Sequence, residues 1–180
     1  MPSFSDSRMF GKPKRDFQRQ RVYTAESRIG KGKRLNSVKE MQSFVDSITS
    51  TPEFRIRFPR IYSIDVKDGR GCRNALGSTT GWVKMPIWSR CEVIVIHEVA
   101  HVVSPWEEHH GPKYCGNYLW LIHKVMGRGM YLELRESFLA HGVKFEDDIQ
   151  KKDYVDPAKK ALEMILAKKA KKQTKETVAC

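Results

Sequence analysis

Residues 89–114 read SRCEVIVIHEVAHVVSPWEEHHGPKY, and this stretch decides the fold. Ser89 and Glu92 form a capping-box pattern, in which a serine hydroxyl and a glutamate three residues later bond the first backbone N–H groups of a helix. Pro105 ends the apolar run that follows, so we predict a helix of about fourteen residues. A helix that is apolar on most sides is expected to lie in the core.

The predicted helix carries the pattern HExxH, with His97 and His101 four residues apart. On a helix this spacing puts both imidazoles on one face, one turn apart, where they can bind one metal ion. Glu98 lies about 100° around the helix from His97, so its carboxylate can reach a water on the metal without being a ligand. Zinc lowers the pKa of its bound water to about 7, and a nearby carboxylate takes the proton as the water attacks a carbonyl. The pattern therefore predicts zinc hydrolysis chemistry, with Glu98 as general base.

The alternative is a core helix without a metal, because the run Val93–Ile96 and the valines after it resemble a buried segment. In that case the two histidines and the glutamate would bind backbone groups. Burying three such side chains in an apolar helix costs free energy unless each has a partner. A metal ion supplies that partner, so we favour the metal site.

The third ligand has two candidates, His109 and His110. His110 precedes Gly111-Pro112 and a stretch with apolar residues at helical spacing, so it lies at the start of a second helix, where rigid structure positions a ligand. We therefore favour His110, and His109 is the alternative ligand or a group that stabilises an oxyanion. His123 and His141 are expected to be structural or exposed.

Residues 61–88 show the pattern of short strands, with apolar residues separated by polar ones and by glycine turns. Pro86 follows the last of these strands, and proline cannot donate to a central ladder, so we predict that this strand lies at or near an edge. An edge strand beside an active site can hold an extended peptide by main-chain pairing. The candidate substrate-binding residues of this strand are Trp82, Val83, Lys84 and Met85.

Three helices are predicted before the strands. A short docked helix is expected within residues 16–29, where apolar residues recur at roughly helical spacing. The next begins with the capping-box pair Ser37 and Glu40 and carries one apolar stripe. A short third helix begins at Pro52 and is closed by Pro59.

The net charge of +12 lies at the two ends of the 180-residue chain. Residues 1–35 hold ten Lys or Arg and three Asp or Glu, and residues 157–175 hold seven Lys and one Glu, whereas residues 36–156 carry no net charge. Charged ends of this kind are more often solvated extensions than binding surfaces. Nonspecific contact of these ends with nucleic acid is therefore an alternative, behind a protein or peptide substrate.

No secretory or membrane signal is predicted. The first residues lack an apolar segment, and the longest aliphatic run, Val93–Ile96, is far too short to span a bilayer, so we expect a cytoplasmic protein without a membrane partner. The cysteines form no CxxC pair, which disfavours a Cys-ligated zinc or a disulfide framework. The four expected free thiols are Cys72, Cys91, Cys115 and Cys180.

The arrangement HEVAH, eight residues, then HGPKY resembles the SprT-like and related small zincins. It is more closely similar to a family of zinc metallohydrolases of actinobacteria and their phages, which shares RDFQRQRVYTAE near the start and MPIW before the motif helix. The resemblance covers about residues 15–143. It implies a zincin-like fold, zinc bound by His97, His101 and His110, and Glu98 as base. For a phage-encoded protein it also implies the host cytoplasm.

The length allows one core of ordinary size, so we expect a single α+β domain of the small zincin-like kind. A short mixed sheet is expected, with an edge strand over the active-site helix and extra helices at both ends. The predicted parts are a disordered basic arm over residues 1–14, the metallohydrolase domain over 15–143 and a Lys-rich helical extension over 144–180.

The predicted function is a metallopeptidase that cleaves peptide or amide bonds with one Zn²⁺ per chain and a water activated by Glu98. The alternative is a non-catalytic zinc-containing protein, either a nucleic-acid-binding protein or a phage accessory protein, that uses its basic ends.

Overall fold

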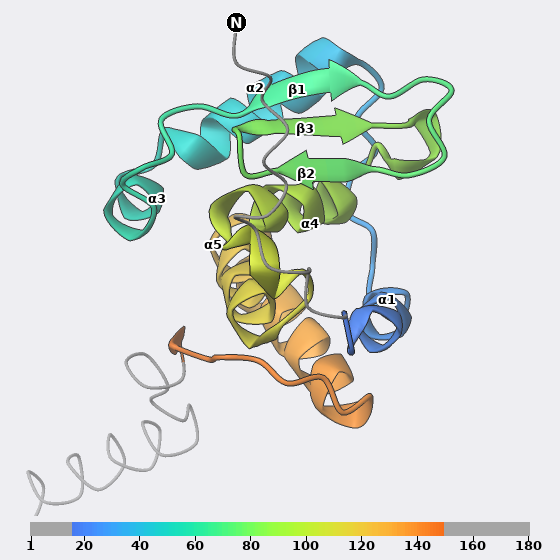
Figure 1. Ribbon diagram of the computed structural model, residues 1–180, viewed down its shortest axis with the longest axis vertical. Helices are drawn as coiled ribbons and strands as arrows, with labels where there is room; N and C mark the ends of the chain where they lie inside the picture. Colours follow the sequence, from blue (N-terminus) through green and yellow to red (C-terminus); the bar gives the residue numbers. More distant parts are fainter. Residues whose placement is uncertain (1–15, 150–180) are drawn as a thin grey trace, which may run out of the picture. The chain divides into compact units, whose positions relative to one another are not determined.

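The computed structural model describes residues 16–149 (Figure 1). The predicted arm over residues 1–14 and the part of the predicted extension beyond residue 149 lie outside this range. All elements belong to one compact unit that ends at Glu146. In chain order they are α1 Arg19–Glu26, α2 Val38–Thr49, α3 Pro52–Arg57, β1 Asp65–Asp68, β2 Leu76–Ser78, β3 Trp82–Met85, the 3-10 turn η1 Ile87–Ser89, α4 Glu92–Val103, the 3-10 turn η2 Trp106–Glu108 and α5 Pro112–Ala140.

The sheet has three strands in the order β1-β3-β2. β1 runs parallel to β3, with Val66 opposite Val83, and β2 runs antiparallel to β3, with Gly77 opposite Val83. A short mixed sheet beside several helices confirms the predicted α+β class. The pairing of β1 with β3 is non-local, because the chain passes through β2, on the far side of β3, before it forms β3.

The predicted place of the last strand is wrong. Trp82–Met85 forms β3, which is the central strand and not an edge. Pro86 lies one residue beyond β3, so its missing N–H leaves no gap in the ladder, and the backbone carbonyl of Met85 still accepts from the Gly69 N–H at 3.1 Å. The edge strand that lies over α4 is β2, which the sequence pattern did not predict (Figure 1).

The opposite edge of the sheet is covered by α2. The helix begins as predicted, because the Ser37 hydroxyl accepts from the Glu40 N–H at 3.0 Å. The Gln42 side chain then bonds two backbone groups at the outer edge of β1 and just before it, accepting from the Val66 N–H at 2.8 Å and donating to the Ile64 carbonyl at 2.9 Å. The outer edge of β1 is thus covered by α2. The other outer strand, β2, has an edge whose residues line a cleft.

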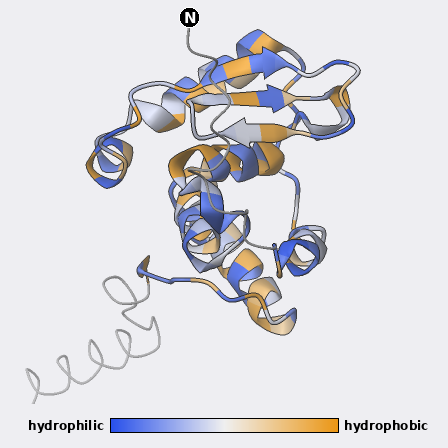
Figure 2. Ribbon diagram, in the orientation of Figure 1, coloured by the Kyte–Doolittle hydropathy of each residue, from blue (hydrophilic) through white to orange (hydrophobic). Residues whose placement is uncertain are grey.

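The motif helix α4 has twelve residues and lies between the sheet and α5 (Figure 1). Figure 2 shows how strongly hydrophobic residues dominate it. They are buried against β2, β3 and α5, which explains why a run this apolar forms an interior helix.

The predicted capping box at the start of α4 is wrong. Ser89 lies in η1 and its hydroxyl donates to the Pro86 carbonyl, while the N-cap residue Cys91 makes no side-chain cap bond. The first N–H groups of α4, those of Glu92 and Val93, instead donate to backbone carbonyls in the loop after α1, at 3.0 and 3.2 Å. A segment distant in sequence thus accepts the hydrogen bonds of the first N–H groups of α4, and a local sequence pattern cannot reveal such a contact.

The long helix α5 is interrupted at Gly127, whose φ of 86° is outside the helical range. Its first half packs Tyr114 and Tyr118 against α4, and both side chains are fully buried. Within the part of the chain that the structure describes, no helix combines the length and apolar character needed to cross a membrane. The described cysteines are free thiols: Cys72, Cys91 and Cys115.

Gly77 sets the distance between β2 and α4. A Cβ atom built at this position would clash with the backbone carbonyl oxygen of Glu98 and would lie 2.9 Å from the Cβ of His101. Neither neighbour is the free end of a flexible side chain, so any larger residue must push the strand away from the helix.

We predict that Gly77→Ala lowers the free energy of unfolding by about 1–3 kcal/mol, because the added methyl group overpacks a backbone contact. Urea unfolding measures this change. Gly129→Ala is the matched control, since Gly129 is exposed on α5 with open space around its Cα, and this substitution should be neutral or stabilise the protein by up to about 1 kcal/mol. Equal effects at the two glycines would show that the close approach of β2 to α4 is not real.

Candidate metal centre

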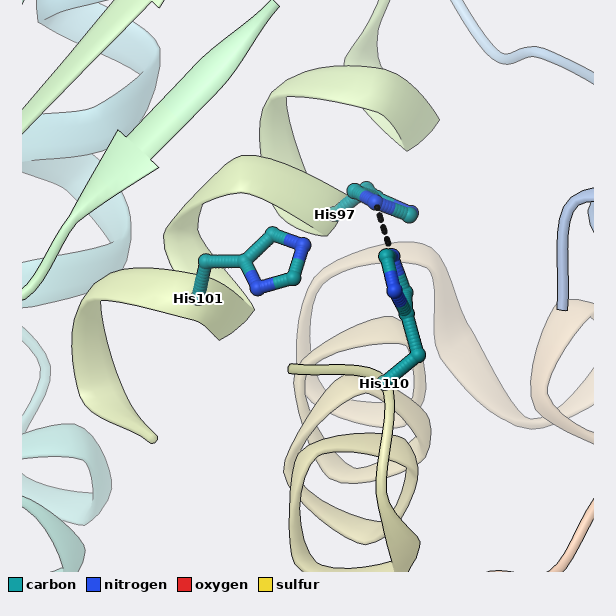
Figure 3. Close-up of side chains that lie close together, drawn as sticks. All are labelled: His97, His101 and His110. Carbon is teal, nitrogen blue, oxygen red and sulfur yellow. Dashed lines mark hydrogen bonds between the residues drawn. The ribbon is translucent and has the colours of Figure 1, made fainter. Parts of the chain in front are cut away.

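Three histidines converge at the surface of α4 that faces α1 and the start of α5. His97 and His101 come from α4, and His110 comes from the turn before α5 (Figure 3). One ligating nitrogen of each lies within 4.8 Å of the other two, and no other such group of histidine, cysteine or acidic residues occurs in residues 16–149. The three side chains lie close enough to hold one metal ion, as the sequence predicted.

The spacing of the ring nitrogens fits a small tetrahedral ion. The Nε2 atoms of His97 and His110 are 3.3 Å apart. Zinc binds histidine nitrogen at about 2.0–2.1 Å, so two ligands of a tetrahedral zinc lie roughly 3.3–3.4 Å from each other. The two rings are therefore separated by about the distance that a shared zinc ion requires.

The remaining histidines lie outside this group. His109 has a positive φ of 47° and lines the same cleft, but it does not belong to the group of three. His123 packs its ring edge-on against Tyr131, and His141 faces the backbone carbonyl of Ser137 with its Nδ1 at 2.8 Å. The last two have structural contacts, as predicted.

Two carboxylates hold the ligand rings in place. Glu26 of α1 bonds Nδ1 of His97 at 2.6 Å, and Asp16, just before α1, bonds Nδ1 of His110 at 2.6 Å. A carboxylate on Nδ1 fixes the tautomer and the ring orientation, so that Nε2 is the atom left to bind a metal. In both rings this is the nitrogen that faces the other histidine.

Burial and these partners determine the charge of the rings. Burial and the neighbouring His97 lower the pKa of His110 to about 4, in spite of Asp16, so His110 is neutral near pH 7. Burial also lowers the pKa of His101 far below its usual range. For His97, burial opposes protonation, but the charge of Glu26 outweighs it and raises the pKa. Neutral imidazole is the form that binds metal, so two of the three rings are ready for it.

Two tyrosines of α5 form the floor beneath the rings. Tyr114 stacks on His101 with ring centres 4.3 Å apart, and its hydroxyl donates to the His97 carbonyl at 3.2 Å. The Tyr118 hydroxyl donates to Glu26 at 3.1 Å. Both side chains are fully buried, and their hydroxyls are used by these contacts.

Glu98 lies beside the histidines in a cleft of about 750 Å³. Its side chain is nearly buried, and its carboxylate accepts a hydrogen bond from the Gly77 N–H of β2. Burial raises the pKa of Glu98 to about 7, which makes the group able both to take and to give a proton near neutral pH. The three histidines line the same cleft, so Glu98 faces the space next to the candidate metal position.

The predicted substrate-binding strand only partly reaches this cleft. Trp82 lines it, whereas Val83 and Met85 are fully buried and lie in the core. Lys84 is half-buried, with its ammonium 5.7 Å from the centre of the Trp82 ring. The strand that runs along the cleft is β2, from Leu76 to Ser78.

Sequence reasoning missed the two carboxylates that bond the rings of His97 and His110. Glu26 lies on the buried face of α1 beside Val22 and Ala25, both of which are fully buried. A carboxylate on an apolar helix face costs free energy without a partner, so this signal was present in the sequence. Asp16 gave no comparable signal, because it precedes the helix and its partner is 94 residues away.

We predict that His110→Ala removes stoichiometric metal binding, whereas His109→Ala keeps it, because only His110 belongs to the group of three. Titration of metal-free protein with zinc in the presence of a chromogenic chelator measures both. If His110→Ala kept tight zinc binding and His109→Ala lost it, the third ligand would be His109 and not His110.

We predict that Glu26→Gln weakens metal binding by about 10–100-fold, since an amide orients the His97 ring less strongly than a carboxylate and raises its basicity less. The same competition with a chelator gives the affinity. Glu133→Gln, which changes an exposed glutamate of α5, is the matched control and should bind metal like the unaltered chain. An unchanged affinity in Glu26→Gln would mean that the carboxylate does not position a ligand.

A comparison of the chain with protein-family models found no match, and comparisons with curated proteins and with solved structures found no significant match. The resemblance to zincins stays a prediction. The candidate metal centre is supported by the geometry of its three histidines.

Proposed function

We propose that the protein is a zinc-dependent hydrolase that cleaves peptide or related amide bonds, with a zincin-like fold in which β2 is the edge strand above the active-site helix. The observation that carries the proposal is one cleft that holds three converging imidazoles and the buried carboxylate of Glu98. Neither part alone would indicate hydrolysis, but their combination provides a metal position and a base beside it.

The ligand set favours zinc in a catalytic role. Nitrogen ligands alone suit zinc better than calcium or magnesium, which prefer oxygen. Structural zinc sites are usually closed by four protein ligands, whereas catalytic sites have three and leave one position open. Within residues 16–149 the group has three members, and the cleft beside them gives a substrate access.

The chemistry divides between the metal and Glu98. When bound, zinc would polarise the scissile carbonyl and make a water acidic enough to attack it near neutral pH. The Glu98 carboxylate accepts the proton of the attacking water and then donates it to the nitrogen of the leaving amine. A pKa raised to about 7 by burial suits both transfers, and a nearby cation would lower that value again.

The edge of β2 supports an extended substrate. β2 pairs with β3 on one side, and its residues line the cleft on the other. A peptide that pairs with this edge would run along α4 and past Glu98, which is bonded to the middle residue of β2, Gly77. Main-chain pairing of this kind recognises the peptide backbone and therefore supports a peptidase.

We predict that Glu98→Gln abolishes turnover while zinc binding is kept, because an amide cannot accept the proton but lies outside the ligand set. Hydrolysis of a mixture of peptides, followed by mass spectrometry, measures turnover, and elemental analysis measures zinc. His97→Ala is the control that should lose both.

Peptide hydrolysis by Glu98→Gln at the rate of the unaltered protein would contradict the mechanism. Absence of turnover in the unaltered, fully zinc-loaded protein across the peptide mixture would contradict the proposed activity.

A further inference from the structure

The walls of the cleft carry large apolar side chains that are exposed. Trp88 is 60% exposed, Leu76 49% and Trp106 40%, and all three line the cleft together with Ile94 and Pro105. Single exposed apolar residues are common on protein surfaces, but a group that lines one concave site is typical of a binding surface. These side chains are therefore candidates to contact what the cleft holds.

The two exposed tryptophans lie at opposite ends of the motif helix. Trp88 belongs to η1, just before α4, and Trp106 belongs to η2, just after it. Twelve helical residues span roughly 18 Å, and His97 and His101 lie between the two ends. An extended chain covers that length with about five or six residues. A peptide along β2 would thus meet one tryptophan on each side of the candidate metal position.

The charges at the cleft complement a neutral or acidic chain. The carboxylates of Asp16 and Glu26 are engaged by histidines, and Lys31 lies 3.8 Å from Glu26 while half of its side chain stays exposed. The Arg19 guanidinium lies over the Tyr23 ring, 5.4 Å from its centre, and both residues line the same cleft. Two cationic groups, Arg19 of α1 and Lys31 of the loop after it, thus line the cleft together with the exposed tryptophans.

We propose that the cleft takes an extended, neutral or acidic polypeptide segment with large apolar side chains on both sides of the scissile bond, one against Trp88 and one against Trp106. This inference rests on the proposed peptidase function and names its substrate class. Folded proteins bury side chains of this kind, so the substrate is a segment of unfolded or loosely structured protein.

Binding to the full-length, zinc-loaded Glu98→Gln variant tests the inference without turnover. Three fluorescein-labelled ten-residue peptides are compared by fluorescence anisotropy. The first has Phe and Leu on both sides of a central bond and Glu at its ends, the second has Ser in place of Phe and Leu, and the third has Lys in place of Glu. The first should bind at least tenfold more tightly than the second, and several-fold more tightly than the third at low salt.

Substitutions of the walls test the contacts. In the Glu98→Gln background, Trp88→Ala and Trp106→Ala should each weaken binding of the first peptide about tenfold, and Trp→Phe at either position should restore most of it. Ile56→Ala is the matched control, because Ile56 is 81% exposed and does not line the cleft, and it should change nothing.

Equal affinity for the apolar and Ser peptides, or unchanged binding in both tryptophan variants, would overturn the inference. Tighter binding of a single-stranded oligonucleotide than of any peptide would also overturn it, if Trp88→Ala and Trp106→Ala abolished the oligonucleotide binding. Cleavage by the unaltered protein without any side-chain preference would refute this substrate class alone. Selective binding without cleavage would refute the proposed hydrolysis and leave the preference of the cleft in place.

Discussion

The site around α4 depends on the hydrogen-bond partners of its buried histidine rings. An imidazole in an apolar interior costs free energy unless its polar atoms have partners. Glu26 and Asp16 meet this need at Nδ1 of His97 and His110, each at 2.6 Å, and leave both Nε2 atoms facing one another at 3.3 Å. Because both carboxylates come from α1 or the residues just before it, the N-terminal helix is part of the candidate metal centre.

Close contacts also connect the sheet to the site. β2 approaches α4 so closely that only glycine fits at position 77, and the N–H of Gly77 bonds the carboxylate of Glu98. The loop after α1 satisfies the first N–H groups of α4. Strand, helix and loop therefore fix Glu98 and the histidines relative to one another, which is the preorganisation that the proposed catalysis would require.

Local signals predicted much of the molecule. The Ser37 cap, Pro52 and the apolar run through α4 depend on neighbours in sequence, and the structure has helices at all three places. The histidine group could also be predicted from the sequence, because the four-residue spacing of His97 and His101 is local and His110 lies just before the next helix.

Non-local contacts explain what the sequence did not reveal. The order of the strands depends on pairings between distant segments, and β2 has only three residues with a glycine at its centre, so no alternation marks it. Glu26 and His97 are 71 residues apart, and Asp16 and His110 are 94 apart. Spacing along the chain cannot connect such pairs, and only the fold brings them together.

We propose that three histidines bind one zinc ion and leave a position open for chemistry. X-ray absorption at the zinc edge of the full-length protein, loaded with one equivalent of zinc, tests it most directly. The expected result is three imidazole nitrogens and one further oxygen at about 2.0–2.1 Å, with no sulfur. A sulfur shell at about 2.3 Å, or a fourth imidazole that closes the site, would contradict it.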